Sequence, residues 1–513
     1  MTSSESTTKA MPSRRHRGAL LISVLLLSAC GITYELLIGA IASYLLGSSV
    51  LQFSLTIGVF LASMGVGAYI SRWIGDDLLE RFIEVEIALA AVGGASGPLL
   101  FVAFTFTGSY YLVMFLLIIM VGALIGLEIP LLTRYLERYS SLRDSIANVF
   151  SLDYLGSLLA SFLFPLVFLP HLGIFRTSLA VGLLNLLIAL ATLLFFWPIL
   201  RRRLRPLLFA LGVAVALAVT LGFGTTLSKA MESRLYRDEI LYAKQSPYQR
   251  LVLTRYRDDV RLYLNGSLQF SSRDEYRYHE ALVLPALSAA ATRNRVLVIG
   301  GGDGLVVRQV LKAPGVKHIV LVDIDPEVTR LAREHPLLRK INNNCLEDKR
   351  VKIIHTDAFR YLDEESALFD VIVVDLPDPQ REVLSKLYSI AFYRAIKRHL
   401  TPGGVAVTQA TSPLFARKAY WCVVASVQAA GLQPLPYHTY VPSFGQWGFI
   451  MMAPRRIRGE QLQVPFPSRS LDDGAMTRMT SFPVDYGPIE VRANTLDRPV
   501  IIEYYREGWD AWF

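Results

Sequence analysis

The sequence predicts an N-terminal all-α transmembrane bundle of about seven helices, followed by a C-terminal α/β Rossmann-like fold of the methyltransferase type with a small β subdomain before it. Two observations predict this organisation. Apolar residues make up 52% of the 513 residues and concentrate before about residue 227. Beyond that point, short apolar runs alternate with polar helical segments, which is typical of parallel-sheet domains.

Five segments follow from this shift in composition. We expect a disordered basic tail (1–18), a multi-pass transmembrane domain (19–227), a small β subdomain (228–290), a Rossmann-like catalytic domain (291–455) and a C-terminal extension (456–513). The extension ends in several aromatic residues. Two interpretations of it are open, a closing helix on the domain or a contact with the membrane surface.

The N-terminal half contains seven apolar runs of about 20 residues, each long enough to cross the ~30 Å hydrocarbon core of a bilayer. They lie at about 19–45, 51–71, 83–107, 110–133, 147–170, 175–199 and 206–227. The first run lacks a small-residue cleavage site, so we expect an uncleaved helix rather than a signal peptide. The sequence thus predicts a multi-pass protein of the cell (inner) membrane that contacts lipid.

Acidic residues interrupt several of these runs. They are Glu35, Glu86, Glu128 and Asp153. Carboxylates inside a membrane are candidates for a functional role. Two interpretations are open: the acids bind a polyamine or another cation, or they pair with Arg134 or Arg143 near the helix ends.

Charge and cysteine content exclude some functions. The net charge of +9 does not indicate nucleic-acid binding, because arginine clusters flank apolar runs and no basic–aromatic binding motif is present. The three cysteines, Cys30, Cys345 and Cys422, form no Cys-x-x-Cys pair. We therefore expect neither a disulfide framework nor a zinc site.

A glycine-rich turn opens the main domain. The stretch Arg295-Val-Leu-Val-Ile-Gly-Gly-Gly-Asp-Gly304 predicts a buried strand and a turn, and Leu305–Leu311 predicts the helix that follows. Glycines let the backbone approach a ligand closely, and the helix N-terminus offers free N–H groups. This pattern alone fits dinucleotide binders and methyltransferase-like folds equally well.

Aspartates follow the next strands. They are Asp303 in the turn, then Asp323, Asp357 and Asp375 at strand ends, with Asp378 just beyond. Because the carboxyl ends of parallel strands meet at one edge of a sheet, we expect these side chains to surround one ligand. A carboxylate after the second strand can accept hydrogen bonds from both hydroxyls of a ribose.

Seven motifs together resemble the spermidine synthase family over about residues 246–449. They are Ser246-Pro-Tyr-Gln249, Asp274-Glu-Tyr-Arg-Tyr-His-Glu280, Gly300-Gly-Gly-Asp-Gly304, Val322-Asp-Ile-Asp-Pro326, Asp357-Ala358, Asp375-Leu-Pro-Asp-Pro379 and Val441-Pro-Ser-Phe-Gly-Gln-Trp-Gly-Phe449. The resemblance implies a polyamine aminopropyltransferase like spermidine synthase. Such an enzyme transfers the aminopropyl group of decarboxylated S-adenosylmethionine to an amine such as putrescine and releases 5′-methylthioadenosine.

The resemblance also implies a role for each matching residue, with Asp375 as the proton acceptor. Contacts to the donor nucleoside are implied for Gln249, Asp323, Asp357 and Ala358. Contacts to the polyamine or the aminopropyl group are implied for Tyr278, His279, Asp303 and Asp378. No metal and no permanently bound cofactor are expected, since the decarboxylated donor is a co-substrate. The expected partners are putrescine or a related polyamine, membrane lipid and a second copy in a homodimer, with no nucleic acid.

The aspartates suit this chemistry because both reactants carry ammonium groups. Asp303 would attract the propylamine and repel the carboxylate of ordinary S-adenosylmethionine, which discriminates between the two donors. The acceptor amine, with a pKa near ~10.4, must lose a proton before it attacks. Asp375 would accept that proton, directly or through water.

Three departures from the family pattern bear on the acceptor. Leu305 breaks the usual second glycine pair, Leu376–Pro377 replaces a Ser/Thr pair, and Phe444 replaces a tyrosine. Phe444 lacks a hydroxyl that could hold an amine. The identity of the acceptor is therefore left open, and it includes amines other than putrescine and longer ones. Two other functions also stay open: a methyltransferase that uses ordinary S-adenosylmethionine, against which Asp303 argues, and a non-catalytic polyamine sensor or transporter.

The distribution of basic residues bears on the orientation in the membrane. They gather before the first run and in alternate loops, which places the N-terminus in the cytoplasm. Seven crossings then place the C-terminal domain outside, whereas the decarboxylated donor is made in the cytoplasm. The side that the catalytic domain faces is therefore left open.

Overall fold

Two compact units make up the computed structural model, residues 1–237 and 238–513. The residues that the structure describes are 14–46, 49–107, 109–138, 141–236 and 238–512. Most of the predicted basic tail, residues 1–13, lies outside them. The first helix already begins at Arg14, inside the segment that the sequence assigns to the tail.

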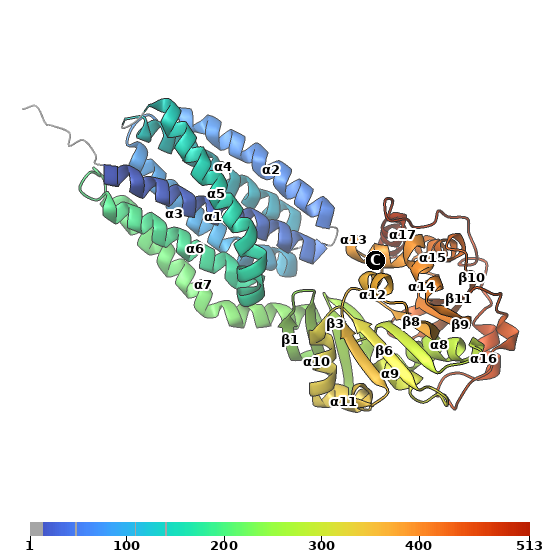
Figure 1. Cartoon of the computed structure of the whole chain (residues 1–513). Helices are drawn as coiled ribbons and strands as arrows, with labels where there is room; N and C mark the ends of the chain where they lie inside the picture. Colours follow the sequence, from blue (N-terminus) through green and yellow to red (C-terminus); the bar gives the residue numbers. More distant parts are fainter. Residues whose placement is uncertain (1–13, 47–48, 108, 139–140, 237, 513) are drawn as a thin grey trace, which may run out of the picture. The chain divides into compact units, whose positions relative to one another are not determined.

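The first unit is a bundle of long helices, drawn in blue to green in Figure 1. Its seven α-helices within the described residues are α1 (Arg14–Leu46), α2 (Ser49–Ile70), α3 (Leu78–Val102), α4 (Tyr110–Leu136), α5 (Leu142–Leu163), α6 (Leu169–Phe195) and α7 (Leu204–Tyr236). Three short segments extend or join them: η1 (Ser71–Trp73), η2 (Ala103–Thr107) and η3 (Phe164–Phe168). By length and apolar composition, six segments could cross a membrane, and one of these is the 54-residue stretch Leu142–Phe195.

Small residues let the helices approach closely. A Cβ atom added to Gly67 of α2 would lie 2.0 Å from the backbone oxygen of Ala123 in α4, and one added to Gly126 of α4 would lie 2.1 Å from that of Met64. Glycine at these positions therefore sets the distance between α2 and α4. The other glycines of α2, Gly58 and Gly65, have no such neighbour within 4 Å.

The acidic side chains of the bundle take different surroundings. Glu86 and Glu128 are both buried. The side-chain amide of Asn185 donates to the backbone oxygen of Glu86 at 3.0 Å. Arg134, an expected partner of the acids, donates to the backbone oxygens of Ser71, at 2.8 Å, and of Ile74.

The second unit begins with a small antiparallel sheet. Its strands, in the order in which they pair, are β1 (Glu239–Gln245), β2 (Arg250–Tyr256), β3 (Asp259–Leu264) and β4 (Ser267–Ser271). Asn265 and Gly266 both have positive φ and form the tight turn between β3 and β4. The sequence predicts that this subdomain starts at residue 228, but α7 continues to Tyr236 because its helical pattern outlasts its apolar run.

A seven-stranded mixed sheet forms the centre of the second unit, in the order β10-β11-β9-β8-β5-β6-β7. The strands are β5 (Arg295–Gly300), β6 (His318–Asp323), β7 (Val351–His355), β8 (Phe369–Asp375), β9 (Leu400–Gln409), β10 (Gln433–Val441) and β11 (Gly445–Ala453). Strands β5 to β9 are parallel, and the glycine turn, Asp323 and Asp375 follow β5, β6 and β8 as the sequence predicts. The antiparallel hairpin β10–β11 extends the sheet at the β9 edge.

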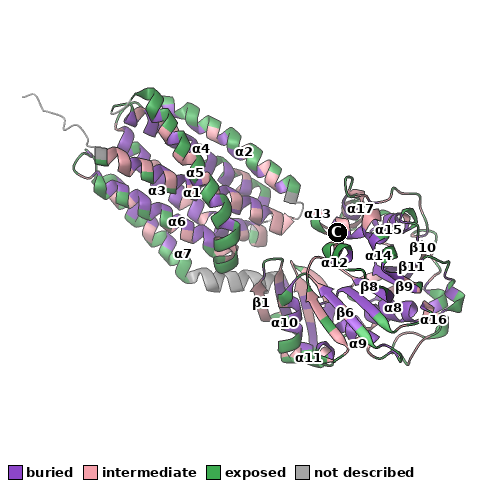
Figure 2. Cartoon of the chain, viewed as in Figure 1, coloured by how far each residue is buried: buried purple, intermediate pink, exposed green. Residues whose placement is uncertain are grey.

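Successive side chains of the central strands point to opposite faces, so the sheet has a core on each side. In β5, Val296 and Val298 lie in one hydrophobic cluster, while Leu297 and Ile299 lie in the other. Figure 2 shows these strands buried. Helix α8 (Glu275–Ala289) packs in the first cluster, although the sequence assigns residues 228–290 to the β subdomain.

Candidate active site

The glycine turn after β5 passes between two aspartates. Gly300 has a φ of 76°, and a Cβ atom there would lie 2.0 Å from the backbone oxygen of Asp375 on the paired strand β8. A Cβ atom on Gly302 would lie 2.5 Å from Oδ2 of Asp323 at the end of β6. Only glycine fits at residue 300, and a side chain at residue 302 would displace the Asp323 carboxylate. The turn therefore brings its backbone against both carboxylate-bearing strands, where the direction of strand order changes.

Asp323 is held from two sides of this turn. The backbone N–H of Gly302 donates to its Oδ2 at 3.0 Å, and that of Asp325 donates to its Oδ1 at 2.8 Å. Burial raises the pKa of Asp323 to about 6, although the hydrogen bond from Asp325 opposes the shift. Its remaining lone pairs are suited to accept hydrogen bonds from hydroxyl groups.

Gln249 reaches this side of the site from the small sheet. Its side-chain amide donates to Oδ2 of Asp325 at 3.0 Å, and the hydroxyl of Ser246 donates to the same atom at 2.7 Å. Asp325 also caps helix α10 (Pro326–Glu334), because its Oδ1 accepts from the N–H of Glu327. Asp325 thus links the small sheet to the end of β6, a role that the sequence does not assign.

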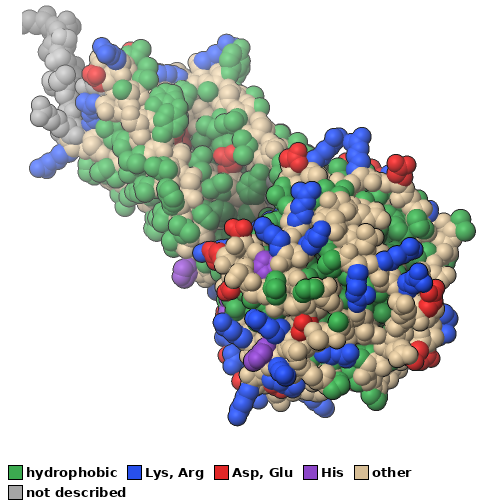
Figure 3. All heavy atoms as spheres, turned by 45° about the vertical axis from the view of Figure 1, so that its right-hand side comes forward, with side chains coloured by type: hydrophobic (Ala, Val, Ile, Leu, Met, Phe, Trp, Pro, Cys, Tyr) green, Lys and Arg blue, Asp and Glu red, His purple; other side chains and the backbone are tan. Residues whose placement is uncertain are grey.

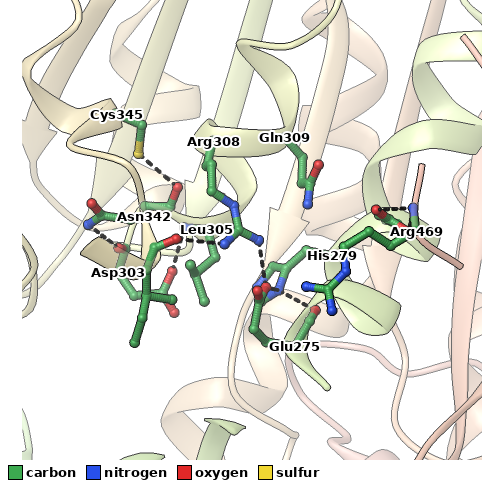
Figure 4. Close-up of polar contacts among 12 residues, drawn as sticks. Glu275, His279, Asp303, Leu305, Arg308, Gln309, Asn342, Cys345 and Arg469 are labelled. Carbon is green, nitrogen blue, oxygen red and sulfur yellow. Dashed lines mark hydrogen bonds and ion pairs between the residues drawn. The ribbon is translucent and has the colours of Figure 1, made fainter. Parts of the chain in front are cut away.

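Asp303 lies at the start of helix α9 (Leu305–Val310). Its Oδ1 accepts from the N–H of Leu305 at 2.9 Å, and its backbone oxygen accepts from the side chain of Asn342 at 3.0 Å (Figure 4). Burial raises the pKa of Asp303 to about 6. His279 opposes this shift, whereas the nearby negative charge of Asp375 adds to it.

Asp375, at the end of β8, accepts a hydrogen bond from the phenol of Tyr278. The two oxygens are 2.7 Å apart. Burial raises the pKa of Asp375, against the opposing effects of His279 and Tyr278. The ring of Tyr278 packs edge-on against Phe449 and Phe444, which fixes the direction of its hydroxyl.

His279 is held by a buried ion pair at the start of α8. Its Nδ1 donates to the backbone oxygen of Glu275 at 2.7 Å and to the carboxylate of Glu275 at 3.0 Å. Figure 4 shows Arg308 reaching the same carboxylate, at 2.6 Å. Burial works against the charge of His279, but Glu275 raises its pKa. The pKa of Glu275 falls to about 2 because His279 and Arg308 outweigh its burial.

Asp378 lies on the loop after β8 and is surrounded by hydrogen-bond donors. Its two oxygens accept from the side-chain amide of Gln409 at 3.2 Å and from the hydroxyl of Thr411 at 3.0 Å. The phenol of Tyr505 is a third partner. Burial raises the pKa of Asp378 to about 6, although Tyr505, Thr411 and Gln409 all oppose the shift.

Asp357 and Ala358 lie at the start of helix α12 (Ala358–Glu364). Asp357 caps this helix, accepting from the N–H groups of Phe359 at 2.9 Å and Arg360 at 3.1 Å. Its other oxygen accepts from Nζ of Lys386 at 2.7 Å. Burial works against its charge, but Lys386 and the helix N–H groups together lower the pKa of Asp357.

The positions that depart from the family pattern also have defined surroundings. Leu305 is buried with apolar residues of the small sheet, among them Leu253 and Phe270, so it connects that sheet to the glycine turn. The backbone oxygen of Leu376 accepts from Gln409 at 2.6 Å. Phe444 supplies a ring to the Tyr278 contact where a tyrosine would add a hydroxyl.

The structure brings most of the predicted residues together at one edge of the sheet. His279, Asp303 and Asp375 lie close enough to affect one another's charge, while Asp323 ends the neighbouring strand β6 and Asp378 lies on the loop after β8. Residues that the sequence does not assign complete the site. They are Glu275, Arg308, Asp325, Gln409, Thr411 and Tyr505. Glu275 and Asp325 lie inside recognised motifs, whereas nothing in the local sequence marks the others.

This arrangement is that of a nucleoside-binding α/β enzyme that handles a cationic substrate. Residues 275–457 match the sequence profile of the spermine/spermidine synthase domain. The polyamine aminopropyltransferase of Leptospira interrogans is 45% identical over 497 residues, which cover 96% of this chain and 99% of that protein. The polyamine aminopropyltransferase of Mycobacterium tuberculosis is 38% identical and covers 97% of both chains.

Identity over nearly the whole length includes the helical unit as well as the site. The chain therefore belongs to the polyamine aminopropyltransferase (spermine/spermidine synthase) family. Among solved structures, spermidine synthase of Thermotoga maritima is similar at 22% identity and a TM-score of 0.44, over 48% of this chain and 85% of that chain.

Proposed function

We propose that this chain is a multi-pass membrane aminopropyltransferase that transfers the aminopropyl group of decarboxylated S-adenosylmethionine to putrescine or a related amine. The observation that carries the proposal is the gathering of Asp303, Asp323, Asp375 and Asp378 at one sheet edge around a glycine turn. Both substrates are cations, and a group of half-buried carboxylates suits ammonium groups better than phosphates.

The donor nucleoside lies on the β6 and β7 side of the turn in this proposal. Asp323 binds the ribose hydroxyls, because two of its lone pairs stay open beside the backbone N–H groups that hold it. Asp357, Ala358 and Gln249 contact the rest of the nucleoside. Asp303, at the start of α9, receives the ammonium of the aminopropyl group.

Asp375 serves as the general base. The acceptor reaches the enzyme as an ammonium and transfers one proton to Asp375, and the freed nitrogen attacks the aminopropyl carbon next to sulfur. The new C–N bond forms as the C–S bond breaks, and sulfur keeps the electron pair, which gives neutral 5′-methylthioadenosine. Burial supports this role because a raised pKa makes Asp375 a stronger proton acceptor.

The acceptor amine lies on the β8 and β9 side. Asp378 binds the ammonium that does not react, and Tyr278 and His279 line the path of the amine. Tyr278 also fixes Asp375 through its 2.7 Å hydrogen bond. Holding two cations in line supplies much of the rate, since the sulfonium is already a good leaving group.

The helical unit crosses the cell (inner) membrane in this proposal. Its exposed surface is apolar, as Leu112 at 72% and Leu208 at 68% exposure illustrate, whereas Glu86 and Asn185 are fully buried. Figure 3 shows hydrophobic side chains over the visible face of this unit. A 54-residue segment spans ~81 Å as helix, far more than the ~30 Å of hydrocarbon. Leu142–Phe195 therefore crosses twice, with the reversal near Gly173, whose φ and ψ of 70° and 173° are not helical.

An assay of the full chain in detergent or lipid tests the enzymatic proposal. The purified protein receives decarboxylated donor and a panel of amines, and methylthioadenosine is measured. We expect product with at least one diamine, and none with ordinary S-adenosylmethionine. If none of the amines gives product but the protein still binds polyamines, a sensor or transporter is favoured. The homodimer stays a prediction. Light scattering of the same preparation measures the oligomeric state and tests it.

The Asp375→Asn variant tests the general base. Loss of the proton acceptor should lower turnover about 10²- to 10⁴-fold, as is typical when a general base is removed. Binding of methylthioadenosine should remain. Asp363→Asn, on the exposed face of α12, serves as the control and should keep normal turnover. Undiminished turnover in Asp375→Asn would refute the assignment of the base but not the reaction.

A further inference from the structure

The C-terminal extension reaches the acceptor side of the site. Helix α17 (Val500–Asp510) packs on helix α15 (Arg417–Ala429) and places the phenol of Tyr505 beside the loop after β8. The Tyr505 hydroxyl accepts from the side-chain amide of Gln380 at 3.1 Å and lies close enough to Asp378 for each group to shift the pKa of the other. Since Gln380 supplies the proton in the first contact, the hydroxyl is left to donate to the Asp378 carboxylate.

A second contact from the extension holds the far end of the same loop. The side-chain amide of Asn494 donates to the backbone oxygen of Ser385 at 2.8 Å, and its backbone oxygen accepts from the N–H of Ile390 at 3.0 Å. Asn494 is fully buried. The extension therefore holds the segment 378–390 at both ends.

The hydrogen bonds of Asp378 leave room for one more partner. A carboxylate accepts about four hydrogen bonds. Gln409 and Thr411 account for two of them, and the Tyr505 hydroxyl is placed to supply a third. All three of these side chains are neutral. None of them cancels the negative charge of Asp378, which stays available to an ammonium.

We propose that Tyr505 is a positioning residue for the amine acceptor, holding Asp378 and Gln380 where the unreacted ammonium binds. The inference rests on the proposed function. It gives the C-terminal extension a role at the site, and it supplies a phenol hydroxyl on the acceptor side, where Phe444 lacks one. Tyr505 acts on the amine through Asp378, whereas the donor-side residues lie on other strands.

Tyr505→Phe tests the proposal because phenylalanine keeps the ring and its packing. The KM for the amine should rise about tenfold, while kcat and the KM for the decarboxylated donor stay within about twofold. Tyr504→Phe is the matched control, since Tyr504 lies next to Tyr505 in α17 and its ring contacts Lys418 rather than the site. This control should leave both KM values unchanged.

The pH dependence of kcat/KM separates a change in the pKa of Asp378 from a change in packing alone, because only the first shifts the acid limb. Tyr278, Tyr388 and Tyr505 are the titratable groups whose phenols face Asp378. Loss of the Tyr505 hydrogen bond raises the pKa of Asp378, so the acid limb of kcat/KM for the amine should shift to higher pH. In an Asp378→Asn background, Tyr505→Phe should add no further rise in KM.

The results separate this inference from the function on which it rests. A wild-type chain that yields no methylthioadenosine with any amine overturns the proposed function. An active wild type whose Tyr505→Phe variant keeps its amine KM overturns the role of Tyr505 alone. Equal rises in the KM for both substrates, or in Tyr504→Phe as well, would mean that α17 supports only the stability of the domain.

Discussion

Burial raises the pKa values of the site carboxylates, which makes them weaker acids than ordinary aspartates. Asp303, Asp323 and Asp378 all have pKa values raised to about 6, and in each case loss of water is the largest cause. Burial of a charge is costly, so these groups take up protons at a higher pH than ordinary carboxylates do. An incoming ammonium reverses this effect because it favours the charged carboxylates. Substrate and site therefore stabilise each other's charges.

The raised pKa values predict how activity depends on pH. The acceptor amine, with a pKa near ~10.4, stays protonated throughout the acidic range, so only the enzyme titrates there. As the pH falls through about 6, Asp303 and Asp378 take up protons and lose their attraction for ammonium groups. We expect kcat/KM for the amine to fall more than tenfold per pH unit below this point.

Steady-state kinetics between about pH 4.5 and pH 8 measure this dependence, and circular dichroism at each pH confirms that the protein stays folded. A flat profile down to about pH 4.5 would contradict the prediction, because carboxylates with ordinary pKa values would still be charged there.

The sequence predicts the site residues whose positions follow from the order of the strands alone. Asp323 and Asp375 end apolar runs, and parallel strands bring such ends together. Gln409 ends β9 and Thr411 lies just beyond it, and neither gave such a signal, because this strand ends without an acid. Tyr505 lies more than a hundred residues from Asp378 along the chain, and only the packing of α17 brings the two together.

At the scale of elements, contacts between α2 and α4 depend on glycines that differ sharply in surroundings. Gly67 faces the backbone of α4, whereas Gly65 faces open space, although the two lie in the same helix two residues apart. Gly67→Ala should destabilise the helical unit by about 1–3 kcal/mol because the helices must separate. Gly65→Ala should be neutral or stabilising by up to about 1 kcal/mol, because alanine has the higher helix propensity.

Thermal unfolding of both variants in the same detergent compares these effects. The predicted order of midpoint temperatures is Gly67→Ala below wild type, and Gly65→Ala equal to wild type or above it. A Gly67→Ala midpoint that equals that of wild type would mean that α2 and α4 do not pack as closely as described.

Helix α8 shows why the sequence misplaced part of the site. The helix follows the small sheet directly, so local order groups it with the β subdomain. Its apolar face, with Ala281 and Leu284, instead covers the large sheet. Strands β10 and β11 escaped prediction for a different reason: proline and histidine interrupt β10, and only pairing with β11 makes the segment extended.

For the whole molecule, basic residues mark one end of the helical bundle. Arg134, at the end of α4, contacts Ser71 just after α2. The N–H groups of Arg201 and Arg202, ahead of α7, donate to Glu80 near the start of α3. The start of α1 lies at the same end, because the ring of His16 packs on Phe195 at the end of α6. Helix α7 runs from this end to the other.

The proposed seven crossings put the start of α1 and the end of α7 on opposite sides of the membrane. Reporter proteins fused before Met1 and after Phe513 should therefore give opposite signals in whole cells. Equal signals from the two fusions would mean an even number of crossings and would overturn the double crossing of Leu142–Phe195. The same pair of fusions decides on which side the catalytic unit receives its substrates.

The glycine turn also limits how this protein can change during evolution. Every single-base substitution in a glycine codon that alters the residue introduces a Cβ atom or a stop. At Gly300 that atom would collide with the backbone of β8, and at Gly302 with the Asp323 carboxylate. A single mutational step therefore disrupts the turn at Gly300 or displaces the Asp323 carboxylate at Gly302. We expect natural variants to leave both positions untouched, even where the neighbouring helix surface drifts freely.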